Sequence, residues 1–429
     1  MSAPTAAGTS AQPPSIAPAS IAVMARHHRA PLTRRLARIA LRRACGLPAS
    51  AGQREGLAKQ LADLPPVALA DVPRLLEASG LGALVYADLP ADLPSSLRAA
   101  GADLLARTRA RGRRLAQDRA ALSSGLQDVS VPYRPLKGAW LAPFAYATPD
   151  RRPMADTDLF VASDEWSAAQ RALQRLGYRR TARTWKHEVW LKPDNRRVVE
   201  PRGEHPDNPR PVELHPRLGE TFRGLSIELD RAQPGARGAH LLAHATVDML
   251  SRRLRPIALI DVARWAMLQD DEAWQTILRT ARAAGVARFL WPALALAQRE
   301  LDLFLPAEPM TQLEAAIEPS LRQWTAALDL DAVGRDARID VGRALLEVDR
   351  IWPVGTRERL RVLREQVLPG RWQLADRDPA LAERWWWPWA VAQHVAGLPL
   401  LGLSRWRRRS KHPAGSSIDD GREGDEAQR

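Results

Sequence analysis

The feature that most constrains the fold is a change in the spacing of apolar residues near Val131. Before it, residues 31–130 carry apolar side chains at helical spacing, and the leucines from Leu97 to Leu122 recur at intervals of 7, 11 and 7 residues. From Val131 to residue 225 the pattern changes to short strand-like runs separated by Pro, Gly and Asp. A sheet-forming segment therefore lies between helical ones.

The strand-like runs are VPYRPLKG, DTDLFVA, YRRTART, KHEVWLK, RRVVE and PVELHPRL. Residues 163–178 separate the second run from the third and have a helical pattern, with Ser163 as the predicted N-cap and Gly177 as the predicted C-cap. This succession predicts an α+β fold, in which a small mixed sheet with helices on one face is flanked by helical regions on both sides.

Helical spacing returns after residue 235, in the stretches HLLAHATVDMLSRRL, PIALIDVARWAML and EAWQTILRTARAAGVARFLWPALALAQREL, without a repeat of 20 to 50 residues. The low-complexity ends predict disordered tails. We therefore expect a tail at 1–30, a helical region at 31–130, the sheet-containing core at 131–225, a helical region at 226–409 and a tail at 410–429.

The chain has 63 Lys and Arg against 49 Asp and Glu, a formal charge of +14, but only five of the basic residues are lysines. Such an arginine bias is typical of a GC-rich genome, so the charge alone does not indicate nucleic acid, although it would attract nucleoside triphosphates and other polyanions. The single cysteine, Cys45, excludes an intrachain disulfide, and the N-terminal stretch has no signal-peptide pattern. We expect a reducing, cytoplasmic location.

Residues 385–409 have tryptophans at both ends, an apolar middle and arginines behind it. Pro388, Gln393, His394 and Pro399 interrupt the apolar run, which is shorter than the ~20 residues that a membrane-spanning helix needs. We expect a helix that covers the core, in preference to peripheral contact with a membrane.

Asp156 and Asp158 stand two residues apart at the start of an apolar run. Residues two apart on a strand point to the same side, so this spacing places two negative charges next to each other. Such a pair needs a cation, and Mg²⁺, or Mn²⁺ in its place, suits carboxylate oxygens.

PVELHPRL offers a third ligand. Alternation along a strand would turn Val212 and Leu214 to the core, and Glu213 and His215 to the other face, toward the aspartates. In PLKGAW, the strand-to-helix turn at Lys137 and Gly138 could present backbone N–H groups and a lysine charge to phosphate, although a glycine at such a turn is also common for purely structural reasons.

These residues resemble the uncharacterised branch of the nucleotidyltransferase superfamily, which shares the DNA polymerase β-like core. The resemblance spans residues 130–265, a range that includes His244 and Asp261 as matching positions. It rests on motifs in matching order and spacing. The motifs are Leu136-Lys137-Gly138, Tyr146, Arg152-Pro153-Met154-Ala155-Asp156-Thr157-Asp158-Leu159, Gly177-Tyr178 and Val212-Glu213-Leu214-His215.

The resemblance implies that Asp156 and Asp158 are metal ligands and that Glu213 is the third carboxylate. Lys137 and Gly138 would bind nucleotide where related enzymes carry Gly-Ser, which is a departure, as is the gap of 17 residues from Gly138 to Asp156. The implied reaction is attack by an acceptor nucleophile on the α-phosphorus of a nucleoside triphosphate, with pyrophosphate leaving. The acceptor, a small molecule, a protein or a polymer, is not specified.

For several other polar residues, both a functional and a purely structural role remain open. Arg152 could clamp phosphate or form a salt bridge that orders the loop before the strand. His215 and His187 could contact substrate or serve the strands that carry them. His240 and His244 share a helix face but lack the glutamate of a zinc-protease helix, and Asp261 is expected to anchor helix packing.

Two rival functions remain. A non-catalytic nucleotide-binding module would keep the fold, but has less need of three crowded carboxylates. A basic RNA-binding or RNA-modifying protein would use the arginine-rich helices, but the stacking aromatic motifs of such proteins are missing.

Overall fold

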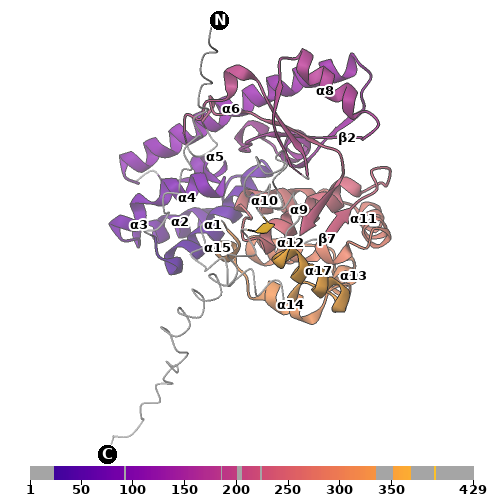
Figure 1. Cartoon of the computed structure of the whole chain (residues 1–429). Helices are drawn as coiled ribbons and strands as arrows, with labels where there is room; N and C mark the ends of the chain where they lie inside the picture. The colour runs from indigo at the N-terminus through magenta and orange to yellow at the C-terminus, as the bar shows by residue number, and fades with distance from the viewer. Residues whose placement is uncertain are drawn as a thin grey trace, which may run out of the picture. The chain divides into compact units, whose positions relative to one another are not determined.

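The computed structural model describes residues 24–90, 93–184, 186–200, 205–222, 225–334, 351–368 and 391–392 (Figure 1). The chain divides into two units, residues 1–362 and 363–429, and nearly all described residues belong to the first. Most of the two predicted tails and of the tryptophan-rich segment lies outside the described residues. Helix α1 begins at Arg26, inside the segment predicted as a tail.

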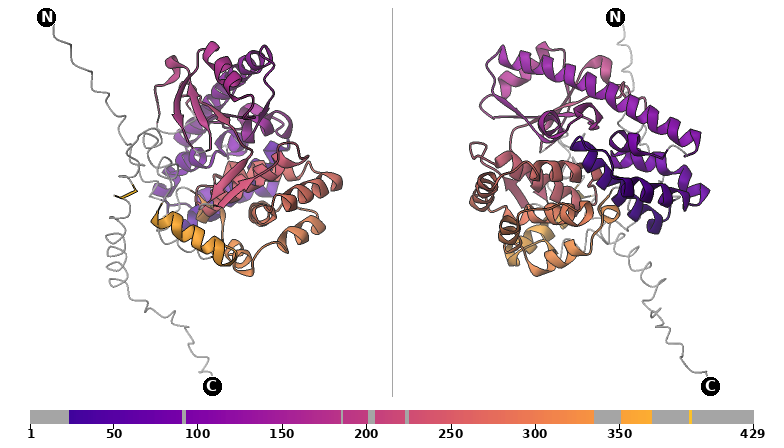
Figure 2. Two further views of the ribbon diagram at one scale, coloured as in Figure 1. Left: turned by 45° about the vertical axis from the view of Figure 1, so that its right-hand side comes forward. Right: turned by 180° about the vertical axis from the view of Figure 1, so that it is seen from behind.

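The N-terminal part of the first unit is helical, as the leucine spacing predicted. The leucines from Leu97 to Leu122 lie on one buried stripe of the long helix α6, which crosses the upper part of the right-hand view in Figure 2. The elements are α1 (Arg26–Ala44), α2 (Ala51–Ala62), α3 (Pro66–Ala70), α4 (Val72–Ser79), α5 (Gly82–Val85), η1 (Tyr86–Asp88) and α6 (Ser95–Gln127).

A five-stranded mixed sheet follows, in the order β1-β2-β5-β4-β3, with β2 and β5 parallel and the other neighbours antiparallel. The predicted α+β class, a small mixed sheet flanked by helical regions, is confirmed. The elements are β1 (Tyr133–Pro135), α7 (Lys137–Ala145), η2 (Pro149–Arg151), β2 (Thr157–Val161), α8 (Trp166–Arg175), β3 (Arg179–Arg183), β4 (Glu188–Leu191), η3 (Pro193–Asn195) and β5 (Val212–His215).

Alternation along β2 and β5 gives the sheet an apolar face and a polar face. Leu159 on β2 and Leu214 on β5 join an apolar cluster with Leu122 of α6 and Leu173 of α8. Their neighbours Asp158 and Glu213 point away from that cluster because successive side chains on a strand alternate. The helices α6 and α8 therefore cover the apolar face of the sheet, and the polar residues Asp158 and Glu213 lie on the opposite face.

The α8 helix ends where the sequence indicated. Gly177 has φ +86°, and the N–H of Tyr178 donates to the carbonyl of Leu173, as in a Schellman motif. The predicted N-cap at Ser163 is wrong, because residues 163–165 form a turn and the helix begins only at Trp166.

Residues 196–200, predicted as a strand, are not one. The buried side chain of Asn208 accepts hydrogen bonds from the N–H groups of Val199 and Glu200 and donates to the carbonyl of Glu200. One side chain thus takes the place of a neighbouring strand. The sequence also failed to predict a separate antiparallel pair, β6 (Gly219–Phe222) and β7 (Leu225–Glu228).

The helical region after β7 contains the predicted start at Pro256, whereas the last predicted stretch is divided at Gly285, which has φ +67°. Among the described residues, no helix has the length and apolar character needed to cross a membrane. The elements are α9 (Ala236–Leu250), α10 (Pro256–Ala266), α11 (Asp271–Ala283), η4 (Ala287–Phe289), α12 (Trp291–Leu301), α13 (Ala307–Glu314), α14 (Pro319–Ala326), α15 (Leu330–Val333) and α17 (Gly355–Val367).

Candidate active site

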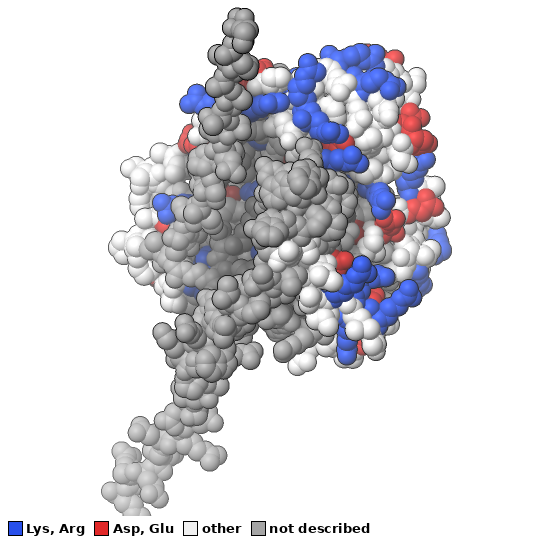
Figure 3. Space-filling model, in the orientation of Figure 1, with Lys and Arg blue, Asp and Glu red and all other residues white. Residues whose placement is uncertain are grey.

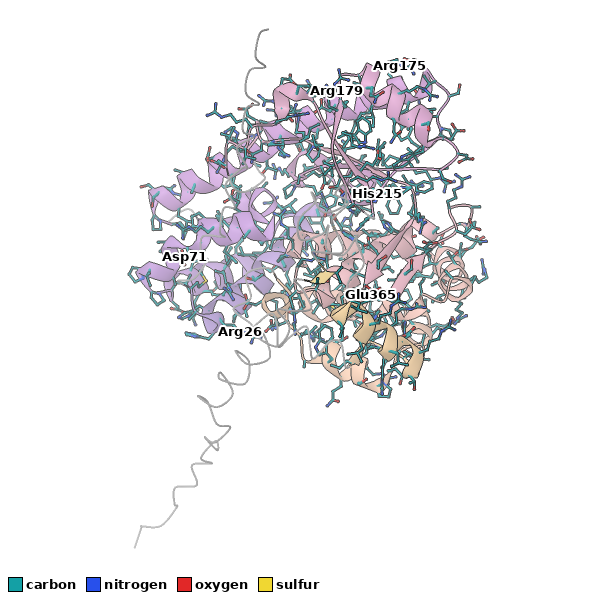
Figure 4. All side chains as sticks on the ribbon, viewed as in Figure 1. Arg26, Asp71, Arg175, Arg179, His215 and Glu365 are labelled. Atoms are coloured by element: carbon teal, nitrogen blue, oxygen red, sulfur yellow. The ribbon has the colours of Figure 1, made fainter. Side chains whose placement is uncertain are left out.

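Three carboxylates meet on the polar face of the sheet. Asp158 and Glu213 are register partners on the parallel strands β2 and β5, and Asp156 precedes β2 by one residue. His215, the last residue of β5, lies in Figure 4 where this sheet approaches the helices of the lower part of the view. The structure therefore brings together the residues that the Asp-x-Asp and VELH motifs singled out.

Asp158 is buried and paired with two cationic or polar donors. Its Oδ1 accepts a hydrogen bond from Lys137 Nζ at 2.7 Å and lies 2.9 Å from His215 Nε2. Burial disfavours the charged carboxylate, but Lys137 and the hydrogen bond from His215 hold the pKa of Asp158 well below its usual range. Asp158 is therefore ionised at neutral pH.

Asp156 has the opposite environment. It forms no hydrogen bond or ion pair with any residue that the structure describes, and burial together with repulsion from Asp158 and Glu213 raises the pKa of Asp156 to about 7. A carboxylate held next to two others without a partner of its own is typical of a functional site. Lys137 is the ammonium that faces all three carboxylates, so negative charge is in excess here.

Glu213 lies between two imidazoles. Its Oε2 is 3.4 Å from His187 Nδ1 and 3.7 Å from His215 Nε2. The neighbouring His215 lowers the pKa of Glu213 although burial opposes the charge, and burial lowers the pKa of His187 to about 4. His187 is thus neutral at pH 7. The ligand atoms of His187, Glu213 and His215 all lie within 4.8 Å of one another.

The Lys137–Gly138 turn places a helix N-terminus beside β2. The N–H of Leu136 donates to the carbonyl of Asp158 at 3.0 Å, and α7 starts at the next residue. Lys137 has φ +46°, which is unfavourable for a residue with a side chain, and its contact with Asp158 helps to hold it there. The first N–H groups of α7, which have no partner within the helix, are left for a ligand such as phosphate.

Arg152 packs directly over this turn. A Cβ atom added to Gly138 would lie 2.2 Å from Arg152 Nη1, so any other residue here would require the guanidinium to move. Arg152 also binds both carboxylate oxygens of Asp261, and the Tyr146 hydroxyl donates to the same carboxylate at 2.6 Å. The loop salt bridge proposed for Arg152 is present, and its partner is the expected packing residue of α10.

Arg111 of α6 fixes the segment before the aspartates. Its buried guanidinium donates to the carbonyls of Met154 and Ala155 at 2.8 and 2.6 Å, and also reaches carbonyls of the loop before β5. One side chain thereby joins the two loops that enter β2 and β5. No motif distinguished this arginine from its neighbours in the sequence of α6.

A second polar cluster adjoins the site and was not predicted. Glu220 of β6 is buried and accepts hydrogen bonds from Lys186 Nζ at 2.7 Å, while His244 Nδ1 lies 2.9 Å from its Oε1. Although burial disfavours its charge, Lys186 and His244 hold the pKa of Glu220 well below its usual range. His240 completes the cluster, and burial lowers its pKa to about 4. The pairing of His240 and His244 was visible in the sequence, but Glu220 was not.

Comparison with known families matches residues 66–302, more than half of the chain, to the family described as "Uncharacterised nucleotidyltransferase". The matched range contains the whole sheet, the three carboxylates, the Lys137–Gly138 turn and the Glu220 cluster. Searches of the curated proteins and of the solved structures found no match.

Proposed function

The chain belongs to the uncharacterised nucleotidyltransferase family, and on that premise we propose that it moves a nucleoside monophosphate from a nucleoside triphosphate to an acceptor in a Mg²⁺-dependent reaction. The observation that carries the proposal is the carboxylate cluster. Asp158 and Glu213 are neighbours on parallel strands, and Asp156 stands beside them without an ion-pair partner among the described residues.

The donor set fits Mg²⁺, or Mn²⁺ in its place. Asp156, Asp158 and Glu213 supply hard oxygen ligands, and their mutual repulsion is the condition that a divalent cation relieves. Mg²⁺ bound by them would neutralise phosphate charge and stabilise the charge that develops in transfer. Asp158 would contribute to the site while its Oδ1 accepts a hydrogen bond from Lys137.

The protein's own groups would position the triphosphate. The start of α7 lies beside the beginning of β2, and Lys137, which contacts Asp158, is close enough to the carboxylates to bind a phosphate oxygen there. Arg152 is engaged by Asp261, so we assign it to holding the Gly138 turn, and a direct phosphate contact would require that pair to open. His187 and His215 would border the acceptor.

In the proposed reaction, an acceptor nucleophile attacks the α-phosphorus and forms a new bond to it. The bond from the α-phosphorus to the bridging oxygen breaks, and pyrophosphate leaves with that oxygen. One of the three carboxylates accepts the proton of the nucleophile, which is within the range of roles that a positioned carboxylate can fill.

The arginines of α6 offer little support for the RNA-binding alternative. Arg107, Arg109 and Arg114 form ion pairs with Glu200, Asp150 and Asp207 of the same chain. On the face drawn in Figure 3, the described basic side chains form separate groups, of which those at the right-hand edge lie beside acidic ones. Many of the positive charges therefore serve contacts within the protein.

The proposal is tested by following a radioactive label carried on either the α- or the γ-phosphate of a nucleoside triphosphate. The purified chain is incubated with Mg²⁺ and cell extract, and with each nucleoside triphosphate labelled at the α- or the γ-phosphate. We expect label from the α-position alone to appear in an acceptor, and to be absent with a chelator or with Asp158→Asn. Asp164→Asn, which changes an exposed aspartate just beyond β2, is the matched control.

Other outcomes separate the alternatives. Transfer of the γ-label would indicate a phosphotransferase. Nucleotide binding without transfer of either label, in every extract tested, would favour the non-catalytic module.

A further inference from the structure

The imidazoles of His187 and His215 lie on either side of Glu213, and a Mg²⁺ site, which prefers oxygen ligands, does not require them. We propose that His187, Glu213 and His215 bind a divalent transition-metal ion of the zinc class, at a position next to the Mg²⁺ site and sharing Glu213 with it. The inference goes beyond nucleotidyl transfer, because it concerns a metal that would bind with or without nucleotide.

The distances between the donor atoms suit such an ion. Tetrahedral Zn²⁺ with bonds of about 2.0–2.1 Å has neighbouring ligand atoms ~3.3 Å apart. The Glu213 Oε2 atom is 3.4 Å from His187 Nδ1 and 3.7 Å from His215 Nε2. The ligand atoms of all three residues lie within 4.8 Å of one another, so side-chain rotations that draw the two imidazoles together would complete the geometry.

The fold alone does not account for these two histidines. Nδ1 of His187, the atom that lies 3.4 Å from Glu213 Oε2, is buried and has no hydrogen-bond partner among the described residues. His215 has no exposed side-chain surface, and its Nε2 points into the cluster at Asp158 and Glu213. A buried imidazole nitrogen without a hydrogen-bond partner is costly, so the Nδ1 of His187 beside Glu213 and His215 calls for a ligand.

The chemistry of the donors selects the metal. Mg²⁺ prefers an octahedral shell of oxygens, whereas imidazole suits Zn²⁺ and its first-row neighbours. Two histidines and one glutamate leave a fourth position open to water or substrate, which is the arrangement of a catalytic zinc site. Binding at His215 Nε2 would require the neutral imidazole to carry its proton on Nδ1, and it would replace the contact with Asp158 Oδ1, which is 2.9 Å away.

The local charge also favours a dication. Among the described residues, Lys137 faces all three carboxylates, Arg152 lies near Asp156 but is bound by Asp261, and Lys186 is held by Glu220. A divalent ion would offset the excess of negative charge without requiring either lysine to move.

The test uses Co²⁺ as a spectroscopic substitute for Zn²⁺. The full chain is freed of metal with a chelator and titrated with Co²⁺ in the absence of nucleotide. We expect the intense visible absorption of a four- or five-coordinate site, loss of that absorption when Zn²⁺ is added, and no loss with a large excess of Mg²⁺. Displacement of Co²⁺ by Mg²⁺, or the weak spectrum of six oxygen ligands, would overturn the proposal.

Variants identify the ligands. His187→Ala should weaken Co²⁺ binding at least about 100-fold, since loss of even an outer-shell partner costs roughly 10- to 100-fold. His27→Ala removes an exposed imidazole in α1 and should change nothing. Equal affinity in wild type and His187→Ala would refute the assignment.

A measurement on the wild type covers the case in which His187→Ala does not fold. X-ray absorption of the Zn²⁺-loaded wild type should show two imidazole ligands, and oxygen ligands alone would refute the site. Asp156→Asn separates the two proposals, because it should abolish Mg²⁺-nucleotide binding and keep the Co²⁺ spectrum.

Discussion

Replacing Asp261 with asparagine tests whether Arg152 is a structural residue. The Arg152 guanidinium binds both oxygens of Asp261, with side-chain exposures of only 11% and 4%. Asparagine keeps the size and one acceptor oxygen, so the Tyr146 hydroxyl retains a partner, but the negative charge is lost. The change therefore leaves a buried guanidinium without its counter-charge.

The expected cost is large. Removing one member of a buried ion pair lowers the free energy of unfolding by about 3–5 kcal/mol, and since Arg152 is slightly exposed we expect about 3 kcal/mol for Asp261→Asn. Tyr146→Phe removes only a hydroxyl from the same carboxylate and should cost about 1 kcal/mol. Both residues belong to one network, so the double variant should deviate from additivity.

Urea unfolding, monitored by tryptophan fluorescence, measures these changes in the free energy of unfolding. They follow from the shift in the urea midpoint, provided that the dependence of the free energy on urea concentration is unchanged. Asp164→Asn is the control, because its partner Arg231 is 3.6 Å away and both side chains are about half exposed or more, so the change should cost less than about 1 kcal/mol. A cost below ~1 kcal/mol for Asp261→Asn as well would refute the reasoning. Arg152 would then be free to serve as the phosphate clamp.

Three further changes address the site and its surroundings. Lys137→Ala should weaken nucleotide binding by roughly 1.5–3 kcal/mol. It should also raise the pKa of Asp158 and so move the pH midpoint of Mg²⁺-dependent binding upward. Unchanged affinity at every pH would show that Lys137 is not part of the site. Gly138→Ala should lower stability by about 1–3 kcal/mol because its Cβ would collide with Arg152. Gly138→Ala should cost much less when it is introduced into Arg152→Ala, and an equal cost in both backgrounds would contradict the clash. Burial lowers the pKa of His240 from 6.5 to about 4, so the unfolded chain binds more protons than the folded chain between these values. The free energy of unfolding should therefore fall by on the order of 3 kcal/mol as the pH drops from 6.5 to 4. An equally steep fall in His240→Gln would show that His240 is not the cause.

Residue spacing predicted the parts of the structure that depend on local periodicity. The leucine intervals of α6, the alternation in β5 and the Asp-x-Asp pair each follow from the geometry of one helix or strand. These features predicted that Glu213 faces the aspartates, and the parallel pairing of β2 with β5, which no local pattern predicted, makes Asp158 and Glu213 register partners.

Tertiary partners decided what the sequence failed to predict. Residues 196–200 have a strand-like composition, but Asn208 takes up the backbone groups that a neighbouring strand would have used. The strands β6 and β7 pair only with each other, outside the main sheet, and were not predicted, so Glu220 was not assigned to the cluster with His244. The role of Arg111 depends on carbonyls from two distant loops, which no local pattern encodes.

The central claim, that Asp156, Asp158 and Glu213 hold a Mg²⁺-bound nucleoside triphosphate, is tested most directly by calorimetric titration of the chain with a non-hydrolysable triphosphate. Binding should require Mg²⁺, disappear in Asp156→Asn and in Asp158→Asn while both variants keep the wild-type circular dichroism, and persist in Asp164→Asn. If the double variant Asp156→Asn and Asp158→Asn binds Mg²⁺ and the triphosphate as tightly as the wild type does, the nucleotide site lies elsewhere in the chain.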